Sequence, residues 1–327
     1  GIWPPHSALV RNPFREWIGA QIRADIFGYV MPGCSEKAAD LAFRDASVSH
    51  DKNGIYGEMF VAAMVAAAFI ETDAEGIVTA GLNEIPANSR LAEAIRDTQA
   101  WCREELAGRA KNWENVWAKI NERYGHYHGV HTINNAALVV LGIYFGINDF
   151  EQGIVVTTLA GWDTDCNAAT VGSILGVKLG AKALPEKWTS VLNDRLLSAV
   201  RDESDNKLSD LATRTLSVAK TILITSDQDD KATLTGEASG IWELETGWGV
   251  HLLKLSEGTV YLIDDNLGPF PITASSLTDG ELKFSFGIDK GDWDFLVDFE
   301  GRLDGDTLEG SYYPGVVPVN GRRMSHA

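Results

Sequence analysis

Two aspartates stand two positions apart in the stretch GWDTDCNAATVGSILG, residues 161–176, directly before a run of small apolar residues. Asp163 and Asp165 lie where an irregular turn gives way to a helix, and carboxylates in such a turn can direct their oxygens to a common centre. Hard divalent cations such as Mg²⁺ and Ca²⁺ prefer oxygen ligands of this kind. A simpler interpretation is also open, in which Asp165 caps the exposed helix amides and Asp163 is solvated.

Three histidines gather in the stretch YGHYHGVHTINNAA, residues 124–137, just before an apolar helical segment. Imidazole is a common zinc ligand, so His126, His128 and His131 raise the hypothesis of a zinc site. The stretch itself contains no cysteine or carboxylate to complete such a site. We therefore favour a role for His131 in orienting substrate, with His126 and His128 partly exposed.

A polar stretch, SHDKNGIYGEMF at residues 49–60, separates two apolar segments and carries His50, Asp51, Asn53, Tyr56 and Gly57. Polar residues at the mouth of an otherwise apolar bundle often line a pocket. The pattern predicts a pocket wall here.

The elements that must position these residues are predicted to be helices. Apolar residues recur at helical spacing over 36–46, and residues 58–70 are apolar nearly all round, which predicts a buried helix. The other helices are predicted at 89–108, 113–125, 133–146, 149–161, 167–180 and 185–200. Frequent Ala and Gly allow close approach of helix axes. We expect a compact all-α orthogonal bundle over residues 1–225.

The pattern changes after about Thr225. A polar segment gives a predicted linker at 226–235, and short alternating runs closed by Gly, Asp or Asn follow, which predicts a small antiparallel β sandwich or barrel over 236–327. Acidic residues outnumber basic ones in this domain. Its aromatic residues either form a sugar-binding platform or fill the core; they include Trp242, Trp248, Trp293, Tyr312 and Tyr313.

Composition excludes several classes of protein. Lysine and arginine total 28 against 46 aspartates and glutamates, and the net charge of -18 argues against a nucleic-acid partner. No apolar run approaches the roughly 20 residues that span a membrane. The three cysteines, Cys34, Cys102 and Cys166, are too few for a disulfide framework and favour a reducing, cytoplasmic location.

The stretch at 161–176 resembles the C-terminal metal signature of the ADP-ribosylglycohydrolase family, Gly-Gly-Asp-Thr-Asp-Thr-Asn-Ala-Ala. The segment IGAQIRADIFGYVMPG (18–33) is similar to the family's Gly-Ala-Met-Arg segment, and residues 38–68 are similar to its Asp-Ala-x-x-Thr-His segment. The resemblance covers about residues 1–200. It implies an all-α fold and a hydrolase that cleaves an N- or O-glycosidic bond to a ribofuranosyl group. Its implied cofactors are two Mg²⁺ ions, with Mn²⁺ or Ca²⁺ as alternatives.

Carried onto this chain, the resemblance makes Asp163 and Asp165 metal ligands and places the family's hydroxyl ligand at Cys166. A thiol is a poor partner for Mg²⁺, so this departure puts the identity of the metal in question. Trp162 either stacks on a base or sugar, or packs as a wedge. The other implied substrate contacts are Gly19, Gln21, Arg23, His50, Asp51, Tyr56, Gly57, His131 and Asn135.

The family also has a glutamate and an Asp-Asp-Thr-type metal motif upstream of its Gly-Ala-Met-Arg segment, and no paired aspartates precede Gly19 here. We expect this half of the site, with the acid/base carboxylate, to come from a separate or cleaved N-terminal chain, or to be missing by truncation. The expected substrate is a small molecule or an ADP-ribosylated group. Two alternatives stay open: a simpler pentofuranoside or nucleoside as substrate, and a non-catalytic binding protein with a degenerate site.

Overall fold

The structure, a computed structural model, describes residues 1–229 and the backbone of eight strands between Gly240 and Arg323. Side chains beyond Ile222 are described at a minority of strand positions. Outside the description are residues 230–239, 247–248, 257–258, 265–267, 279–280, 290–293, 305–306, 314–316 and 324–327. The chain divides into two compact units, Gly1–Ala219 and Lys220–Ala327. Within the described part, no helix has both the length and the apolar character needed to cross a bilayer.

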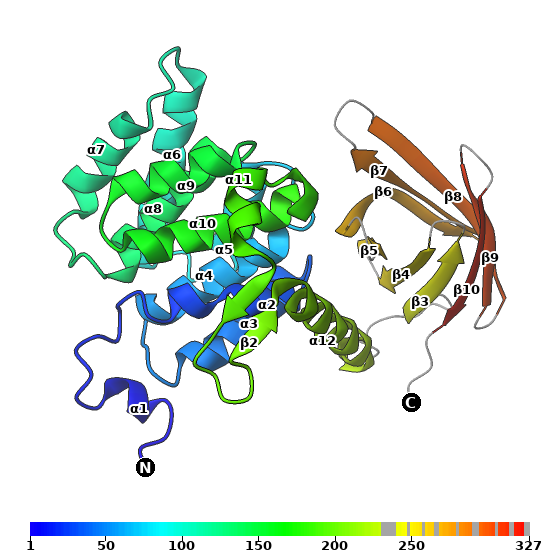
Figure 1. The fold of residues 1–327 in the computed structure, drawn as a ribbon, viewed down its shortest axis with the longest axis horizontal. Coiled ribbons are helices and arrows are strands. Elements are labelled where there is room, and N and C mark those ends of the chain that lie inside the picture. Colours follow the sequence, from blue (N-terminus) through cyan, green and yellow to red (C-terminus); the bar gives the residue numbers. More distant parts are fainter. Residues whose placement is uncertain are drawn as a thin grey trace. The chain divides into compact units, whose positions relative to one another are not determined.

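The first unit is helical, with short 3₁₀ turns between some of its helices (Figure 1). Its elements are α1 (His6–Leu9), η1 (Gln21–Arg23), α2 (Asp25–Tyr29), α3 (Ser35–Ala46), α4 (Asn53–Ala67), α5 (Ala74–Asn83), α6 (Arg90–Ala107), α7 (Trp113–Tyr124), α8 (Thr132–Gly146), α9 (Phe150–Ala160), α10 (Thr164–Leu179), η2 (Ala181–Ala183), α11 (Glu186–Thr189), η3 (Ser190–Leu192), β1 (Arg195–Leu197), β2 (Asp205–Lys207) and α12 (Leu208–Asp229).

Two helices form the centre of this unit. Every residue of α8 is buried, and α4 is buried over most of its length, as its apolar sequence predicts. Helices α4, α5, α6, α7, α9 and α10 all pack against α8. Burying apolar side chains on all sides of a helix is stable only when neighbouring helices cover it completely. The bundle is therefore organised around α8, whose first turn carries Asn135.

Glycines allow α8 and α9 to approach closely. A Cβ atom on Gly142 would lie 1.9 Å from the Thr157 hydroxyl, and one on Gly146 would lie 2.3 Å from Gly153. Such distances are far below van der Waals contact, so no larger residue fits without moving a helix. The close approach brings the end of α9, and with it the turn to α10, against α8.

The helix predicted at 185–200 is wrong beyond its first turn. The chain forms α11 and η3, reverses at Asn193 and Asp194 with φ of 51° at each, and then pairs β1 with β2. Asn and Asp tolerate this left-handed conformation better than most residues. Asp194 also accepts hydrogen bonds from the backbone and hydroxyl of Ser209, which fixes the start of α12.

The loop within the polar stretch at 49–60 is shorter than predicted. Helix α4 begins at Asn53, so only residues 49–52 of this stretch lie before it, within the six-residue connection 47–52 between α3 and α4. Lys52 makes the turn with φ 49°. Tyr56 and Gly57 consequently lie on the first turns of a buried helix.

The second unit is a closed antiparallel barrel in which each strand pairs with its neighbours in sequence and the last strand pairs with the first. This confirms the predicted β fold in its barrel form. The strands are β3 (Gly240–Thr246), β4 (Gly249–Ser256), β5 (Thr259–Asp264), β6 (Gly268–Thr278), β7 (Glu281–Asp289), β8 (Asp294–Asp304), β9 (Thr307–Tyr313) and β10 (Val317–Arg323).

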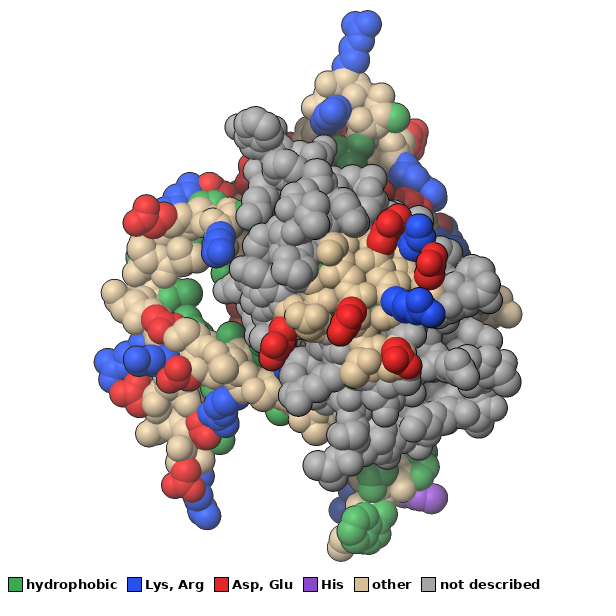
Figure 2. Space-filling model, turned by 90° about the vertical axis from the view of Figure 1, so that its right-hand side faces the viewer, with side chains coloured by type: hydrophobic (Ala, Val, Ile, Leu, Met, Phe, Trp, Pro, Cys, Tyr) green, Lys and Arg blue, Asp and Glu red, His purple; other side chains and the backbone are tan. Residues whose placement is uncertain are grey.

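At the described positions, the barrel is apolar inside and charged outside. Leu244, Leu282, Phe299 and Leu308 are buried, and the Phe299 ring lies over Gly301 and Gly310, where a Cβ would clash with it. Figure 2 shows acidic and basic side chains interspersed on the described outer face, where Lys283 pairs with Glu300 at 3.0 Å. The five aromatic side chains of the predicted sugar platform lie outside the described residues.

The predicted linker overlaps the last helix, because α12 continues through Asp229 and so includes residues 226–229. Residues 230–235 lie outside the described residues. The division into units falls within α12, between Ala219 and Lys220. The domain limits at 225 and 236 stay predictions.

Candidate active site

The candidate metal ligands follow a sharp reversal of the chain between α9 and α10. Gly161 adopts φ 90° and ψ -151°, and Trp162, half-buried, has φ 54°. A non-glycine residue in the left-handed region is strained by about 1–3 kcal/mol and persists only where its surroundings fix it. The turn thus sets Asp163 firmly at the start of α10. Both predicted roles of Trp162, stacking on a ligand or packing as a wedge, stay open.

The Asp163 carboxylate does not cap α10. Asp163 is the N-cap residue, yet its side chain accepts no hydrogen bond from the helix amides. Where another α-helix of this unit has a carboxylate, amide, hydroxyl or imidazole at its N-cap, that side chain does accept such a bond; these residues are Asp73 of α5, Ser89 of α6, Asn112 of α7, His131 of α8 and Asp149 of α9. The alternative in which Asp165 caps the helix is wrong, because Asp165 is already the second residue of α10.

Asp163, Asp165 and Cys166 instead face one another. One ligand atom from each lies within 4.8 Å of the others, and among the described residues no other group of three His, Cys, Asp or Glu side chains converges in this way. The Cys166 thiol donates a hydrogen bond to the Asp163 carboxylate. The donor set of two carboxylates and a thiol therefore fits one divalent cation.

The local electrostatics favour a positive charge at this turn. Burial raises the pKa of Asp163, and the neighbouring Asp165 raises it further. Burial, together with Asp163, raises the pKa of the Cys166 thiol to about 11. Both shifts show that added negative charge is unfavourable here without compensation.

Asn135 ties this turn to the central helix. Its Oδ1 accepts hydrogen bonds from the Asp163 backbone N–H at 3.1 Å and from Asn167 Nδ2 at 2.7 Å. Its Nδ2 donates to the carbonyls of Gly129 and His131. Both polar atoms of its fully buried amide therefore bind the protein, and the backbone of Asp163 is fixed by this contact. The predicted contact of Asn135 with substrate stays a prediction.

Gln21, by contrast, has a side-chain donor without a partner. Its Oε1 accepts from the Thr132 hydroxyl at 2.7 Å, whereas its buried Nε2 has no partner. Gly57 makes room for this contact, since a Cβ there would lie 2.4 Å from the Thr132 hydroxyl. Because η1 packs against α10, Gln21 lies on the element that faces the helix of the aspartates.

Arg23 is engaged within the protein. Its guanidinium pairs with Asp45 and donates to the Ser49 hydroxyl at 3.2 Å and to the Gly19 carbonyl at 3.4 Å. The fully buried Glu58 carboxyl lies 3.9 Å away. Burial and Asp45 raise the pKa of Glu58 to about 9, so Glu58 is protonated at pH 7. Arg23 therefore joins η1 to the end of α3, and its predicted contact with substrate stays a prediction.

His50 and Asp51 also have partners nearby. The His50 Nδ1 lies 2.8 Å from the Ser49 hydroxyl, and the Trp17 carbonyl accepts from the ring. Burial, and then Arg23, lowers the pKa of His50 to about 4, so the ring is neutral. Asp51 pairs with Arg15 at 3.9 Å. The structure does not test the implied approach of these side chains to substrate.

The three histidines do not form a metal cluster. His131 Nδ1 caps the Ile133 amide of α8, and His128 Nδ1 accepts from Val130 while its ring stacks on Trp17. His126 Nδ1 lies 3.0 Å from the Arg123 carbonyl. Burial lowers the pKa of His131, and its accepting Nδ1 leaves the proton on Nε2. His131 thus offers one N–H donor, and its predicted role in orienting a sugar hydroxyl stays open.

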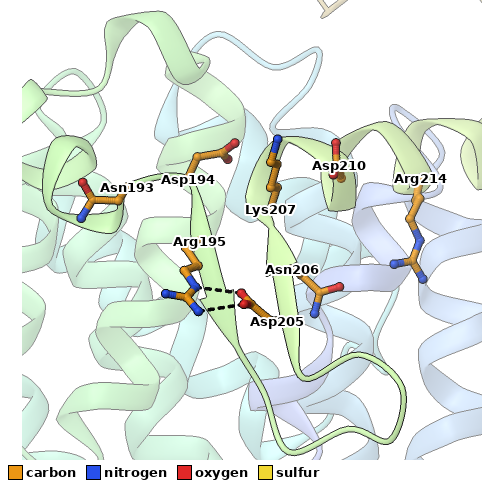
Figure 3. Close-up of a pocket in the computed structure, with 8 residues that line it drawn as sticks. All are labelled: Asn193, Asp194, Arg195, Asp205, Asn206, Lys207, Asp210 and Arg214. Atoms are coloured by element: carbon orange, nitrogen blue, oxygen red, sulfur yellow. Dashed lines mark hydrogen bonds and ion pairs between the residues drawn. The ribbon is translucent and has the colours of Figure 1, made fainter.

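A surface hollow lies elsewhere, between the β1–β2 hairpin and α12 (Figure 3). Arg195 and Asp205 pair across the hairpin, as Figure 3 shows, and Arg214 pairs with Glu203. None of the predicted site residues lines it. Since these charges neutralise one another, the hollow is a poor candidate for a charged ligand.

A protein-family model described as ADP-ribosylglycohydrolase matches residues 4–221, two thirds of the chain. The chain belongs to the ADP-ribosylglycohydrolase family. This confirms the resemblance seen in the stretches at 18–33, 38–68 and 161–176. Among curated proteins, no match was found.

As a member of this family, the protein is a hydrolase of the ADP-ribosyl glycohydrolase type that acts on glycosidic bonds. The match ends within α12, so the barrel lies outside it. The helical unit, with Asp163 and Asp165, is the ADP-ribosylglycohydrolase domain.

Two residues of this domain were missed by sequence reasoning, and a third, Asp25, was not singled out as a site residue. Asn167 is buried and its Oδ1 has no partner, one turn from the aspartates. Glu58 carries a carboxyl group within an otherwise apolar helical stretch, and this contrast could have drawn attention to it. Asp25 turns to α10, where it accepts from Ser173, and burial raises its pKa.

Proposed function

We propose that this ADP-ribosylglycohydrolase is metal-dependent and hydrolyses an N- or O-glycosidic bond to a ribofuranosyl group, with an ADP-ribosyl acceptor as substrate. The observation that carries the proposal is the convergence of Asp163, Asp165 and Cys166 in one turn, with an N-cap carboxylate that is not used for capping. A structural aspartate at this position has no reason to leave the helix amides unsatisfied.

Each residue has a part in this proposal. Asp163, Asp165 and Cys166 hold the cation, and Asn135 fixes the backbone of Asp163. The unpartnered Gln21 Nε2 and the Nε2–H of His131 donate to sugar hydroxyls. The bound cation supplies Lewis acidity towards the ribose hydroxyls and the attacking water at an oxocarbenium-like transition state.

The site takes further ligands from outside these three side chains. Mg²⁺ requires six ligands, and a catalytic site for other divalent ions leaves positions for water or substrate. We propose that the acid/base carboxylate and the remaining ligands come from a separate polypeptide that completes the site. We also propose a reducing, cytoplasmic location, in keeping with three cysteines that form no disulfide.

A substrate without a diphosphate, such as a simpler pentofuranoside or nucleoside, is the second candidate. The observation that favours it is the engagement of Arg23, since its guanidinium already binds Asp45 and Ser49 instead of awaiting a phosphate. The net charge of -18 adds long-range repulsion against an anionic ligand.

The test is hydrolysis of two substrates, an ADP-ribosylated peptide and a nitrophenyl pentofuranoside, before and after treatment with a chelator. Metal dependence requires that chelation abolish activity and that a divalent salt restore it. Preference for the first substrate supports ADP-ribosyl hydrolysis, and preference for the second supports the simpler glycoside. Activity that survives complete chelation would overturn metal dependence.

A further inference from the structure

We infer that Cys166 makes this site selective for a thiophilic divalent ion, such as Zn²⁺ or Co²⁺, bound through the Cys166 thiolate together with Asp163 and Asp165, in preference to Mg²⁺. The inference rests on the proposed metal-dependent function and specifies which ion the site takes.

The position of the sulfur supports direct coordination. Cys166 is half-buried on the first turn of α10, and its thiol donates to Asp163. Its sulfur consequently lies on the same side of the helix as the carboxylates. The fully buried Cys102, in α6, shows the alternative in which a cysteine fills the core.

The number and spacing of the ligands fit such an ion. Catalytic zinc sites commonly use three protein ligands and keep a fourth position open. A tetrahedral ion at about 2.0–2.3 Å from each ligand places the ligand atoms roughly 3.3–3.8 Å apart. The three atoms here lie within 4.8 Å of one another, so small side-chain rotations bring them to that distance.

The chemistry of sulfur then sets the selectivity. Mg²⁺ demands oxygen ligands in near-octahedral geometry, whereas thiolates favour zinc and its neighbours. On coordination, the S–H bond breaks, its electron pair forms the sulfur–metal bond, and the proton passes to solvent. Two carboxylates and one thiolate carry three negative charges, which attract a dication strongly.

The experiment is a titration of the full chain, stripped of metal, with Co²⁺ and Mg²⁺, followed by absorption spectroscopy and thermal unfolding. Cys166→Ser tests the thiol, because it leaves a hydroxyl at that position. Cys34→Ser is the matched control, since Cys34 is also half-buried but lies before α3.

We expect Co²⁺ to produce a thiolate-to-cobalt charge-transfer band in the chain and in Cys34→Ser, and no band in Cys166→Ser. Cys166→Ser should bind Co²⁺ roughly 10- to 100-fold more weakly, or weaker still, and its Tm should respond more to Mg²⁺. If Co²⁺ and Mg²⁺ raise Tm equally without a band, the inference is overturned and the metal-dependent function stands. If neither ion changes Tm or absorption, both fail.

Discussion

Carboxyl groups lie close together at two places in the helical unit, and their negative charge is balanced differently at each. Beside Arg23, the carboxyls of Asp45 and Glu58 meet a guanidinium, and Glu58 keeps its proton at pH 7. At the start of α10, no lysine or arginine pairs with Asp163 or Asp165 among the residues described. The first cluster has a positive charge of the protein beside it, although both Glu58 oxygens are buried without a hydrogen-bond partner, whereas the second has no such charge among the described residues.

The difference separates a cluster that has a counter-charge within the protein from one that has none among the described residues. Both places have a carboxyl with a raised pKa, so a perturbed pKa alone does not mark the active site. The two places differ in whether a positively charged side chain of the protein lies beside the carboxylates and balances their negative charge. Variants in the two clusters should therefore have opposite effects on activity and stability.

The largest effect is expected from Asp163→Asn. Loss of a metal ligand should lower hydrolysis by about 100-fold or more, since even outer partners of metal ligands are worth roughly 10- to 100-fold. Asp45→Asn is the matched variant in the other cluster, and it should keep the response of activity to divalent metal. Initial rates over a range of metal concentrations test this. Equal losses in the two variants would erase the distinction between the clusters.

Asn135→Ala should show how strongly the carboxylates at the start of α10 depend on the hydrogen bonds that Asn135 makes to this turn. It removes the acceptor of the Asp163 amide and leaves buried groups unpaired, which should destabilise the domain by about 2–4 kcal/mol. Hydrolysis should fall by roughly 10- to 100-fold through poorer ligand placement. Urea unfolding and metal titration measure the two effects. Unchanged metal affinity would mean that Asn135 supports the fold alone.

Glu58→Gln should alter stability in alkaline solution. The folded-state pKa of Glu58, about 9, exceeds its ordinary value of 4.5, so folding favours the protonated form. This contribution is present in full below about pH 4.5 and is lost as the pH rises through 9. We expect urea unfolding of the wild type to weaken over that range more steeply than unfolding of Glu58→Gln. Parallel pH profiles would show that Glu58 is not held neutral.

The smallest effect concerns the helix starts. Asp149→Ala should cost about 1 kcal/mol, because the Asp149 side chain caps α9 by accepting from Gln152. Asp163→Ala should cost nothing through capping and should relieve repulsion with Asp165. Thermal unfolding without metal compares them. A similar cost for both would show that Asp163 does cap α10.

The sequence predicted the parts of the fold that depend on local pattern. The apolar residues of α4 and α8 leave no polar face, so burial at the centre of a bundle follows from composition alone. The segment at 185–200 failed because its apolar content suits a helix, while Asn193 and Asp194 reverse the backbone. Helix propensity summed over the segment does not register that two residues adopt the left-handed conformation and reverse the chain.

The candidate site was predicted in part for a similar reason. Asp163, Asp165 and Cys166 are neighbours in the chain, and their convergence is a local matter. The pairing of Arg23 with Asp45 depends on how η1 lies against the end of α3, and spacing along the chain does not encode that contact. The support of Asp163 by Asn135 likewise joins two helices that are distant in sequence.

The complete burial of α8 bears on how the site fluctuates. Amides in a helix covered on every side exchange with solvent only when much of the domain opens, and such segments sit at the high end of local stability. Asn135 anchors the Asp163 turn to that helix. The turn that carries Asp163 is consequently held by the slowest-opening part of the domain, so its backbone should open to solvent only as rarely as α8 itself does.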